Sequence, residues 1–165
     1  MERTAGILIV ASKKRRGEKG VDPSGIRSIF NSDGGEAGKE EVGMQKEEND
    51  LRERTKMFAL TVVRMFGALP KTTEAQVLGK QVLRSGTSVG ANYHEAYRAR
   101  SKAEFIAKCG DSLRELEETG YWLELLVTGE IVPSDKLSSL RQECNELTAI
   151  FVTILKRSKE PQRTS

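Results

Sequence analysis

Apolar residues recur every three or four positions between residues 48 and 159, and this spacing predicts amphipathic helices. The pattern is strongest after Ser101, where the steps alternate between four and three residues as in a heptad seam. The members of this seam are Phe105, Cys109, Ser112, Leu116, Thr119, Leu123 and Leu126. A second seam follows Pro133 and comprises Leu137, Leu140, Cys144, Leu147, Phe151 and Ile154. We expect both seams to face one shared core.

Two further helices precede the seams. The first is expected from about Asn49 to Leu69, because Pro70 pushes the residue before it out of the helical region. The second is expected from Thr73 to about Ala99, and its first residues, Thr73–Gln76, match a capping box.

Start and stop signals also bound the two seam helices. Ser101–Glu104 is a second capping-box pattern, and Gly129 is a typical helix end. Ser134 is the expected N-cap of the last helix. The connections are only a few residues long, which forces neighbouring helices to run antiparallel. The predicted fold is therefore all-α: an antiparallel, up-down four-helix bundle over residues 48–159.

Residues 1–47 show no helical or strand period and hold many glycines. Such a segment buries too little apolar surface to offset the entropy of ordering it, so we expect a disordered N-terminal tail. Residues 160–165 are expected to form a short disordered tail as well. Met44 is an alternative start of translation, which would leave residues 1–43 untranslated.

The composition narrows the class of protein. Aromatic residues make up 5% of the chain, so the core has to be mainly aliphatic. No apolar run approaches the roughly 18 residues that span a membrane, which predicts a cytoplasmic protein without membrane association. The net charge of +3 neither requires nor excludes a nucleic-acid partner, because the clustering of charge decides that question.

Few residues have the pattern of a reactive centre. Cys109 and Cys144 are far apart in sequence and fit free buried thiols better than a disulfide or metal site. His94-Glu95 opens a zinc-like HExxH pattern, but Arg98 occupies the second ligand position. We therefore expect no metal, no cofactor, no catalytic residue and no enzymatic activity.

Basic residues are the main candidates for a binding site. Lys80 and Arg84 lie one turn apart on the second helix. Four more candidates are expected around the corner between the second and third helices: Arg98, Arg100, Lys102 and Arg114. Such a cluster can contact several phosphates. A solubilising surface, with acidic residues interleaved among the basic ones, explains the same residues equally well.

Two other features need an explanation. Residues 85–91 in the middle of the second helix are small or weakly helical. They destabilise an isolated helix by about 2–3 kcal/mol relative to alanine. Their presence therefore implies close packing, a kink or a binding site. Tyr121 and Trp122 lie in the middle of the third helix, either at the edge of the core or as anchors between subunits. Wide apolar faces on the first and third helices favour an oligomer.

Three segments carry a family resemblance: Leu83–Ala96, Arg98–Phe105 and Leu113–Leu126. Over about residues 50–157 the chain resembles a bacterial family of four-helix bundle proteins, also called the ribosomal RNA intervening-sequence protein family. The resemblance implies an antiparallel bundle that assembles as a barrel-like homopentamer, often encoded within insertions in ribosomal RNA genes, and without established catalytic residues. A related retroelement protein, the accessory variability determinant, is positively charged, binds nucleic acid and associates with a reverse transcriptase.

The motif positions that match the family are expected to have structural roles: Ser88, Gly90, Asn92, Glu95 and Ser101. Two hypotheses follow for function. The first is a non-enzymatic, oligomeric accessory protein that binds RNA or DNA and associates with a reverse transcriptase or another protein. The alternative is a structural or protein-interaction scaffold without nucleic-acid binding.

Overall fold

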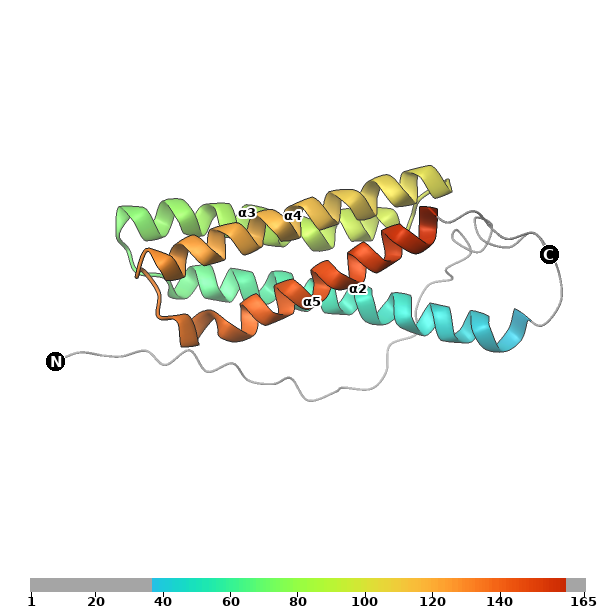
Figure 1. The fold of residues 1–165 in the computed structure, drawn as a ribbon, viewed down its shortest axis with the longest axis horizontal. Coiled ribbons are helices and arrows are strands. Elements are labelled where there is room, and N and C mark those ends of the chain that lie inside the picture. Colours follow the sequence, from blue (N-terminus) through green and yellow to red (C-terminus); the bar gives the residue numbers. More distant parts are fainter. Residues whose placement is uncertain (1–36, 160–165) are drawn as a thin grey trace.

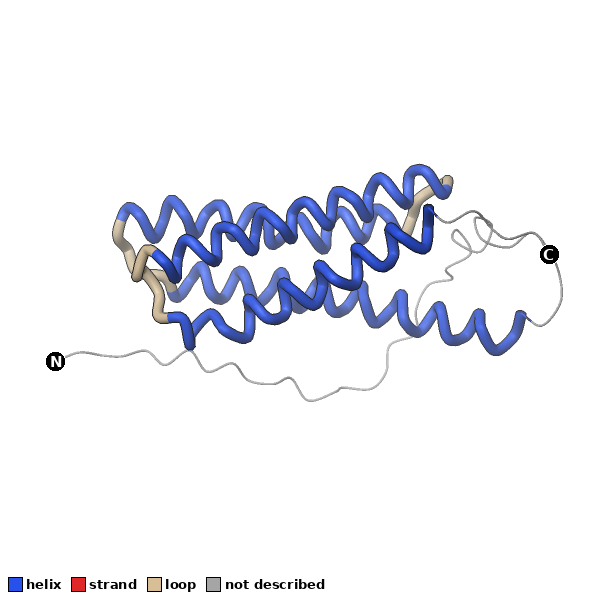
Figure 2. The backbone as a smooth tube through the Cα atoms, in the orientation of Figure 1, coloured by secondary structure: helices blue, strands red, loops and turns tan. Residues whose placement is uncertain are grey.

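Four helices run alternately up and down the long axis of the molecule (Figure 1). The computed structural model describes residues 37–159, with side chains from residue 50 onward. The helices are α2 (Ala37–Ala68), α3 (Thr73–Ala96), α4 (Lys102–Thr128) and α5 (Ser134–Lys159). Short loops join them (Figure 2), so each helix is antiparallel to the one before it. The predicted all-α, up-down four-helix bundle is confirmed.

The first helix is longer than the sequence predicts. It begins at Ala37, before the predicted start near Asn49, and so includes residues 37–47 of the predicted tail. Glutamate and lysine, which are good helix formers, make up five of the eleven residues of this stretch. Extending a formed helix also costs far less than starting one. The tails predicted over residues 1–36 and 160–165 lie outside the described residues.

The predicted cap of α3 is wrong by one residue. The N-cap is Thr72, whose hydroxyl accepts a hydrogen bond from the backbone N–H of Ala75 at 3.4 Å. Gln76 donates to the carbonyl of Pro70 at 2.8 Å instead of closing a capping box. At the other end α3 stops at Ala96, short of the predicted Ala99, because the chain tightens into a turn there.

The cap of α4 agrees with the prediction. Ser101 is the N-cap, and its hydroxyl accepts from the backbone N–H of Glu104 at 3.1 Å. The Glu104 carboxylate in turn accepts from the backbone N–H of Arg100 at 2.8 Å, one residue before the position of a regular capping box. Gly129 is the C-cap of α4, as predicted.

Both predicted seams are buried in the shared core. All seven seam positions of α4 are buried. On α5 the first five are buried and Ile154 is partly buried. The ring of Phe151 packs edge-on against Tyr93 of α3, with the ring centroids 5.4 Å apart.

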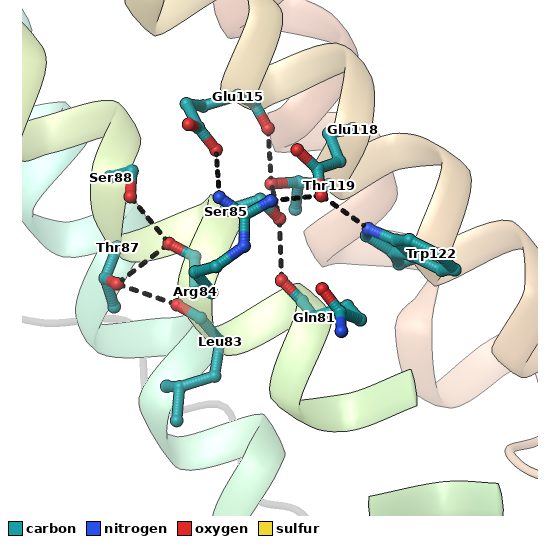
Figure 3. Close-up of polar contacts among 10 residues, drawn as sticks. All are labelled: Gln81, Leu83, Arg84, Ser85, Thr87, Ser88, Glu115, Glu118, Thr119 and Trp122. Atoms are coloured by element: carbon teal, nitrogen blue, oxygen red, sulfur yellow. Dashed lines mark hydrogen bonds and ion pairs between the residues drawn. The ribbon is translucent and has the colours of Figure 1, made fainter. Parts of the chain in front are cut away.

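The small residues in the middle of α3 allow close contact with two neighbouring helices, α2 and α4. On the side of α2, a Cβ atom added at Gly86 would lie 2.8 Å from Cγ2 of Val62, and one at Gly90 would lie 3.3 Å from the carbonyl oxygen of Thr55. On the side of α4, the Ser85 hydroxyl lies 2.8 Å from that of Thr119 (Figure 3). Of the three explanations that the sequence leaves open, close packing therefore accounts for these residues.

The four helices do not pack equally well against one another. α3 packs extensively against α2 and α4, and α4 packs against α5. α2 and α5 make far fewer contacts, although they are neighbours in the bundle. This difference leaves an open groove between α2 and α5.

Candidate nucleic-acid interface

The up-down topology brings three helix ends together at one end of the bundle. The C-termini of α3 and α5 and the N-terminus of α4 all lie there (Figure 1). Arg52 of α2 joins them, because its guanidinium carbon lies 4.2 Å from the ring centroid of Tyr97. We call this region the basic end and define it by its cations: Arg52, Arg98, Arg100, Lys102, Lys156, Arg157 and Lys159.

The carboxylates described at the basic end are fewer, and all of them except Asp50 have a partner. Glu95 forms an ion pair with Lys108 of α4, which raises the pKa of Lys108. Glu53 lies 3.5 Å from Lys56. Glu104 accepts the hydrogen bond from the backbone of Arg100. The cations that define this end are thus left in excess over the carboxylates that could neutralise them.

The opposite end of the bundle has a mixed charge. Lys71 and Lys136 lie near the helix ends there, together with Glu74, Glu130 and Asp135. The bundle therefore presents an uneven charge along its length, and an anionic polymer would be attracted to the basic end.

The six basic residues predicted from the sequence do not form one cluster. Arg98, Arg100 and Lys102 belong to the basic end. Arg84 precedes the end of α3 by twelve residues and Lys80 by sixteen, so they lie roughly 18 and 24 Å away along the helix at ~1.5 Å per residue. Arg114 is equally far into α4. The predicted patch is thus divided between one end and the middle of the bundle.

Arg84 has carboxylate partners on α4. Its guanidinium lies between Glu115, at 3.6 Å, and Glu118, with which it forms a hydrogen-bonded ion pair (Figure 3). The hydrogen bond to Glu118 raises the pKa of Arg84. Hydrogen bonds from Arg84 and from Nε1 of Trp122, which lies at 3.0 Å, lower the pKa of Glu118. Arg84 therefore forms an inter-helix ion pair between α3 and α4.

Arg114 also has an acidic partner, since it pairs with Asp111 one turn earlier on α4. Lys80 is exposed. Arg84 and Arg114 are therefore weaker candidates for phosphate contact than the cations of the basic end, and Lys80 lies far from that end.

Sequence reasoning missed Arg52 and the basic end of α5. Taken along the sequence alone, the basic last turn of α5 only has the charge that favours a helix C-terminus. The signal that could have found both was the topology, because an up-down bundle with four helices places the end of the last helix beside the second connection.

The motif residues of α3 make local contacts. The Ser88 hydroxyl donates to the carbonyl of Arg84 at 2.8 Å (Figure 3). Gly90 lies against the backbone of α2, and Asn92 is half-buried. Together with the ion pair of Glu95 and the cap of Ser101, these contacts suit the structural roles expected for the motif.

Several apolar surfaces remain open. Tyr121 is 53% exposed, and its ring lies edge-on to Trp122 at 5.0 Å. Leu60, Val63 and Val77 are also exposed. The groove between α2 and α5 has a volume of about 1080 Å³, and its apolar lining includes Leu51, Met57, Tyr93, Ile150 and Ile154.

Arg54 spans one side of this groove. Its Nε and Nη2 atoms donate to the carboxylate of Glu143 at 2.7 and 2.9 Å, and it also pairs with Glu146. These contacts raise the pKa of Arg54 and fix α2 to α5 where apolar contact is sparse.

The described residues hold little reactive chemistry. Among the residues whose side chains are described, no group of three or more His, Cys, Asp or Glu residues could hold a metal ion. Cys109 and Cys144 are both buried, and burial raises the pKa of Cys144 to about 11. No helix in the same part of the chain is long and apolar enough to cross a membrane.

Comparison with known proteins shows which proteins this chain resembles. The family model described as 23S rRNA-intervening sequence protein matches residues 47–153. The solved structure of a protein with unknown function from the S23 ribosomal protein family of Bacteroides thetaiotaomicron VPI-5482 is 37% identical in sequence. That match covers 66% of this chain and 97% of the other, with a TM-score of 0.62. No curated protein matches the chain.

Proposed function

This chain belongs to the 23S rRNA-intervening sequence protein family, and on that premise we propose that it is a non-enzymatic accessory protein that binds nucleic acid through its basic end. The observation that carries the proposal is the gathering of Arg98, Arg100 and Lys102 with the basic last turn of α5 at one end of the bundle. Structured RNA is the first ligand to test, because the family is named for an insertion in ribosomal RNA.

The chemistry of this end suits phosphate rather than bases. Lysine and arginine side chains neutralise backbone phosphates and release condensed counterions, which makes binding strong at low salt and largely independent of sequence. No aromatic platform for stacked bases lies among the basic-end cations, and the ring of Tyr97 is covered by Arg52. We therefore expect binding of both RNA and duplex DNA, with little discrimination between sequences.

A gel-shift titration tests the proposal. The variant Arg98→Gln/Arg100→Gln/Lys102→Gln is expected to bind at least about tenfold more weakly than wild type at low salt, because it removes three potential phosphate contacts. The matched control Arg64→Gln/Lys71→Gln/Lys136→Gln removes three exposed cations near the opposite end and is expected to change binding by less than about twofold. Failure of the wild-type protein to bind any nucleic acid at low salt would overturn the proposal.

The second part of the proposal is assembly. Exposed apolar residues and the α2–α5 groove favour association between copies of the chain, and the family resemblance implies a pentamer. Light scattering is expected to give a mass several times the 18.3 kDa of one chain. Tyr121→Gln is expected to shift the protein towards smaller species. A single-chain mass at all concentrations would contradict assembly.

The alternative function is a scaffold without nucleic-acid binding. The same apolar surfaces favour it, and it predicts the same oligomers. The two functions differ in the gel-shift result alone, because a scaffold leaves the RNA and DNA probes unshifted. A reverse transcriptase partner, implied by the resemblance, stays a prediction under either function.

A further inference from the structure

Arg52, His94 and Arg98 come together from α2 and α3 at the basic end. Gly90 lets the two helices approach closely, since a Cβ atom there would lie 3.3 Å from the carbonyl oxygen of Thr55. One turn further along α3, His94 lies at the level of Arg52, one turn back along α2. Arg98 follows His94 by four residues, at the end of the same helix.

These three residues lack an anionic partner in the part of the chain that the structure describes. Neither arginine forms an ion pair with a carboxylate there, and Nε of Arg52 is buried without a hydrogen-bond partner. Partial burial and the charges of Arg52 and Arg98 lower the pKa of His94. Two arginines and a histidine that can become positively charged therefore lie together on one side of the basic end, and no described carboxylate is paired with them.

Other charged groups lie around His94 on the neighbouring helices, and several of them pair with one another. On α3 its neighbour Glu95 pairs with Lys108 of α4. On α2 Glu53 lies beside Lys56, and from α5 the cation Arg157 lines the groove beyond Tyr93. Asp50 of α2 remains, and it lines the α2–α5 groove together with Arg157. None of the described carboxylates forms an ion pair with Arg52, His94 or Arg98.

We propose that Arg52, His94 and Arg98 form a binding site for a backbone phosphate of nucleic acid on the α2–α3 side of the basic end. This inference rests on the proposed function and adds a site within it. Arginine is well suited to phosphate because its planar fork donates two parallel hydrogen bonds. Here the Tyr97 ring holds the Arg52 guanidinium in one orientation, so part of the entropy of fixing that side chain is lost before the ligand arrives.

The affinity of this site for phosphate is expected to depend on pH. A phosphate stabilises the protonated form of His94, so the pKa of His94 is higher in the complex than in the free protein. By linkage the protonated protein binds more tightly. The gain in affinity is complete below the pKa of the free protein and is lost as the pH rises through the pKa of the complex. His94 is the only histidine in the chain, so no other histidine obscures this effect.

The first test measures the affinity of the full chain for a labelled structured RNA and for duplex DNA at two pH values. Wild type is expected to bind about three- to tenfold more tightly at about pH 5.5 than at about pH 7.5, since a pKa change of one unit corresponds to tenfold. His94→Gln should lose this pH dependence and bind like wild type at the higher pH. If the gain in affinity at low pH is the same for RNA and for DNA, the site contacts phosphate alone.

The second test removes the positioned arginine. Arg52→Gln is expected to weaken binding several-fold and to raise the pKa of His94, which NMR of the single histidine reads directly. The matched control Lys136→Gln, at the opposite end, should change neither. The NMR readout needs no ligand and also reports whether the variant is folded.

The outcomes separate this inference from the proposed function. If wild type binds but the pH dependence persists in His94→Gln, or Arg52→Gln binds as well as Lys136→Gln, the phosphate site is wrong and the proposed function stands. If wild type binds no nucleic acid at low salt at either pH, both are wrong.

Discussion

Phe151→Ala is expected to lower the free energy of unfolding by about 3–5 kcal/mol, because it leaves a cavity in the centre of the core. Phe151 is fully buried and packs edge-on against Tyr93, so its loss also removes an aromatic pair. Phe151→Leu keeps most of the volume and is expected to cost less than about 1.5 kcal/mol. Urea denaturation at one fixed protein concentration measures both variants, since assembly makes stability concentration-dependent.

The contrast between the two Phe151 variants tests the packing of α5 rather than hydrophobicity alone. Similar losses for alanine and leucine would mean that the site demands the ring itself. A loss below about 1 kcal/mol for alanine would mean that the core around Phe151 collapses freely, against the close packing described above.

Gly86→Ala is expected to destabilise the bundle by about 1–3 kcal/mol, although alanine is the better helix former by about 1 kcal/mol. The new Cβ would lie 2.8 Å from Cγ2 of Val62, a fully buried β-branched side chain with little freedom to turn away. Gly110→Ala is the matched control. A Cβ at Gly110 meets nothing within 4 Å, so this change is expected to stabilise by about 0.5–1 kcal/mol.

The same denaturation experiment compares these variants with a double mutant. Val62→Ala in the Gly86→Ala background should recover part of the free energy of unfolding that the clash removes. The double mutant should therefore be more stable than the sum of the two single changes predicts. If Gly86→Ala and Gly110→Ala both stabilise the protein, the close approach of α2 and α3 at this position is wrong.

The fold followed from the sequence because its helices carry a regular pattern. The 3/4 spacing of the α4 seam fixes which face each side chain occupies, and every seam residue is buried. Boundaries were less certain for local reasons. Thr72 and Thr73 are adjacent and equally able to cap, and only the turn after Pro70 selects Thr72.

The candidate site depends on relations that sequence spacing does not contain. Arg84 is neutralised by Glu118, 34 residues away, only because of how α3 is rotated against α4. Arg98 and Arg157 are distant in sequence but share one end of the bundle. The sequence therefore identified which residues were basic, whereas the topology decided which of them act together.

The most direct test of the central claim, that the basic end binds nucleic acid, is the salt dependence of binding. On duplex DNA the logarithm of the affinity falls with the logarithm of salt concentration with a slope of about 0.9 per phosphate contact. We expect Arg98→Gln/Arg100→Gln/Lys102→Gln to reduce this slope by about two to three relative to wild type, and Arg64→Gln/Lys71→Gln/Lys136→Gln to leave it unchanged. Equal slopes for wild type and the basic-end variant, or a loss of slope in the far-end control alone, would contradict the claim.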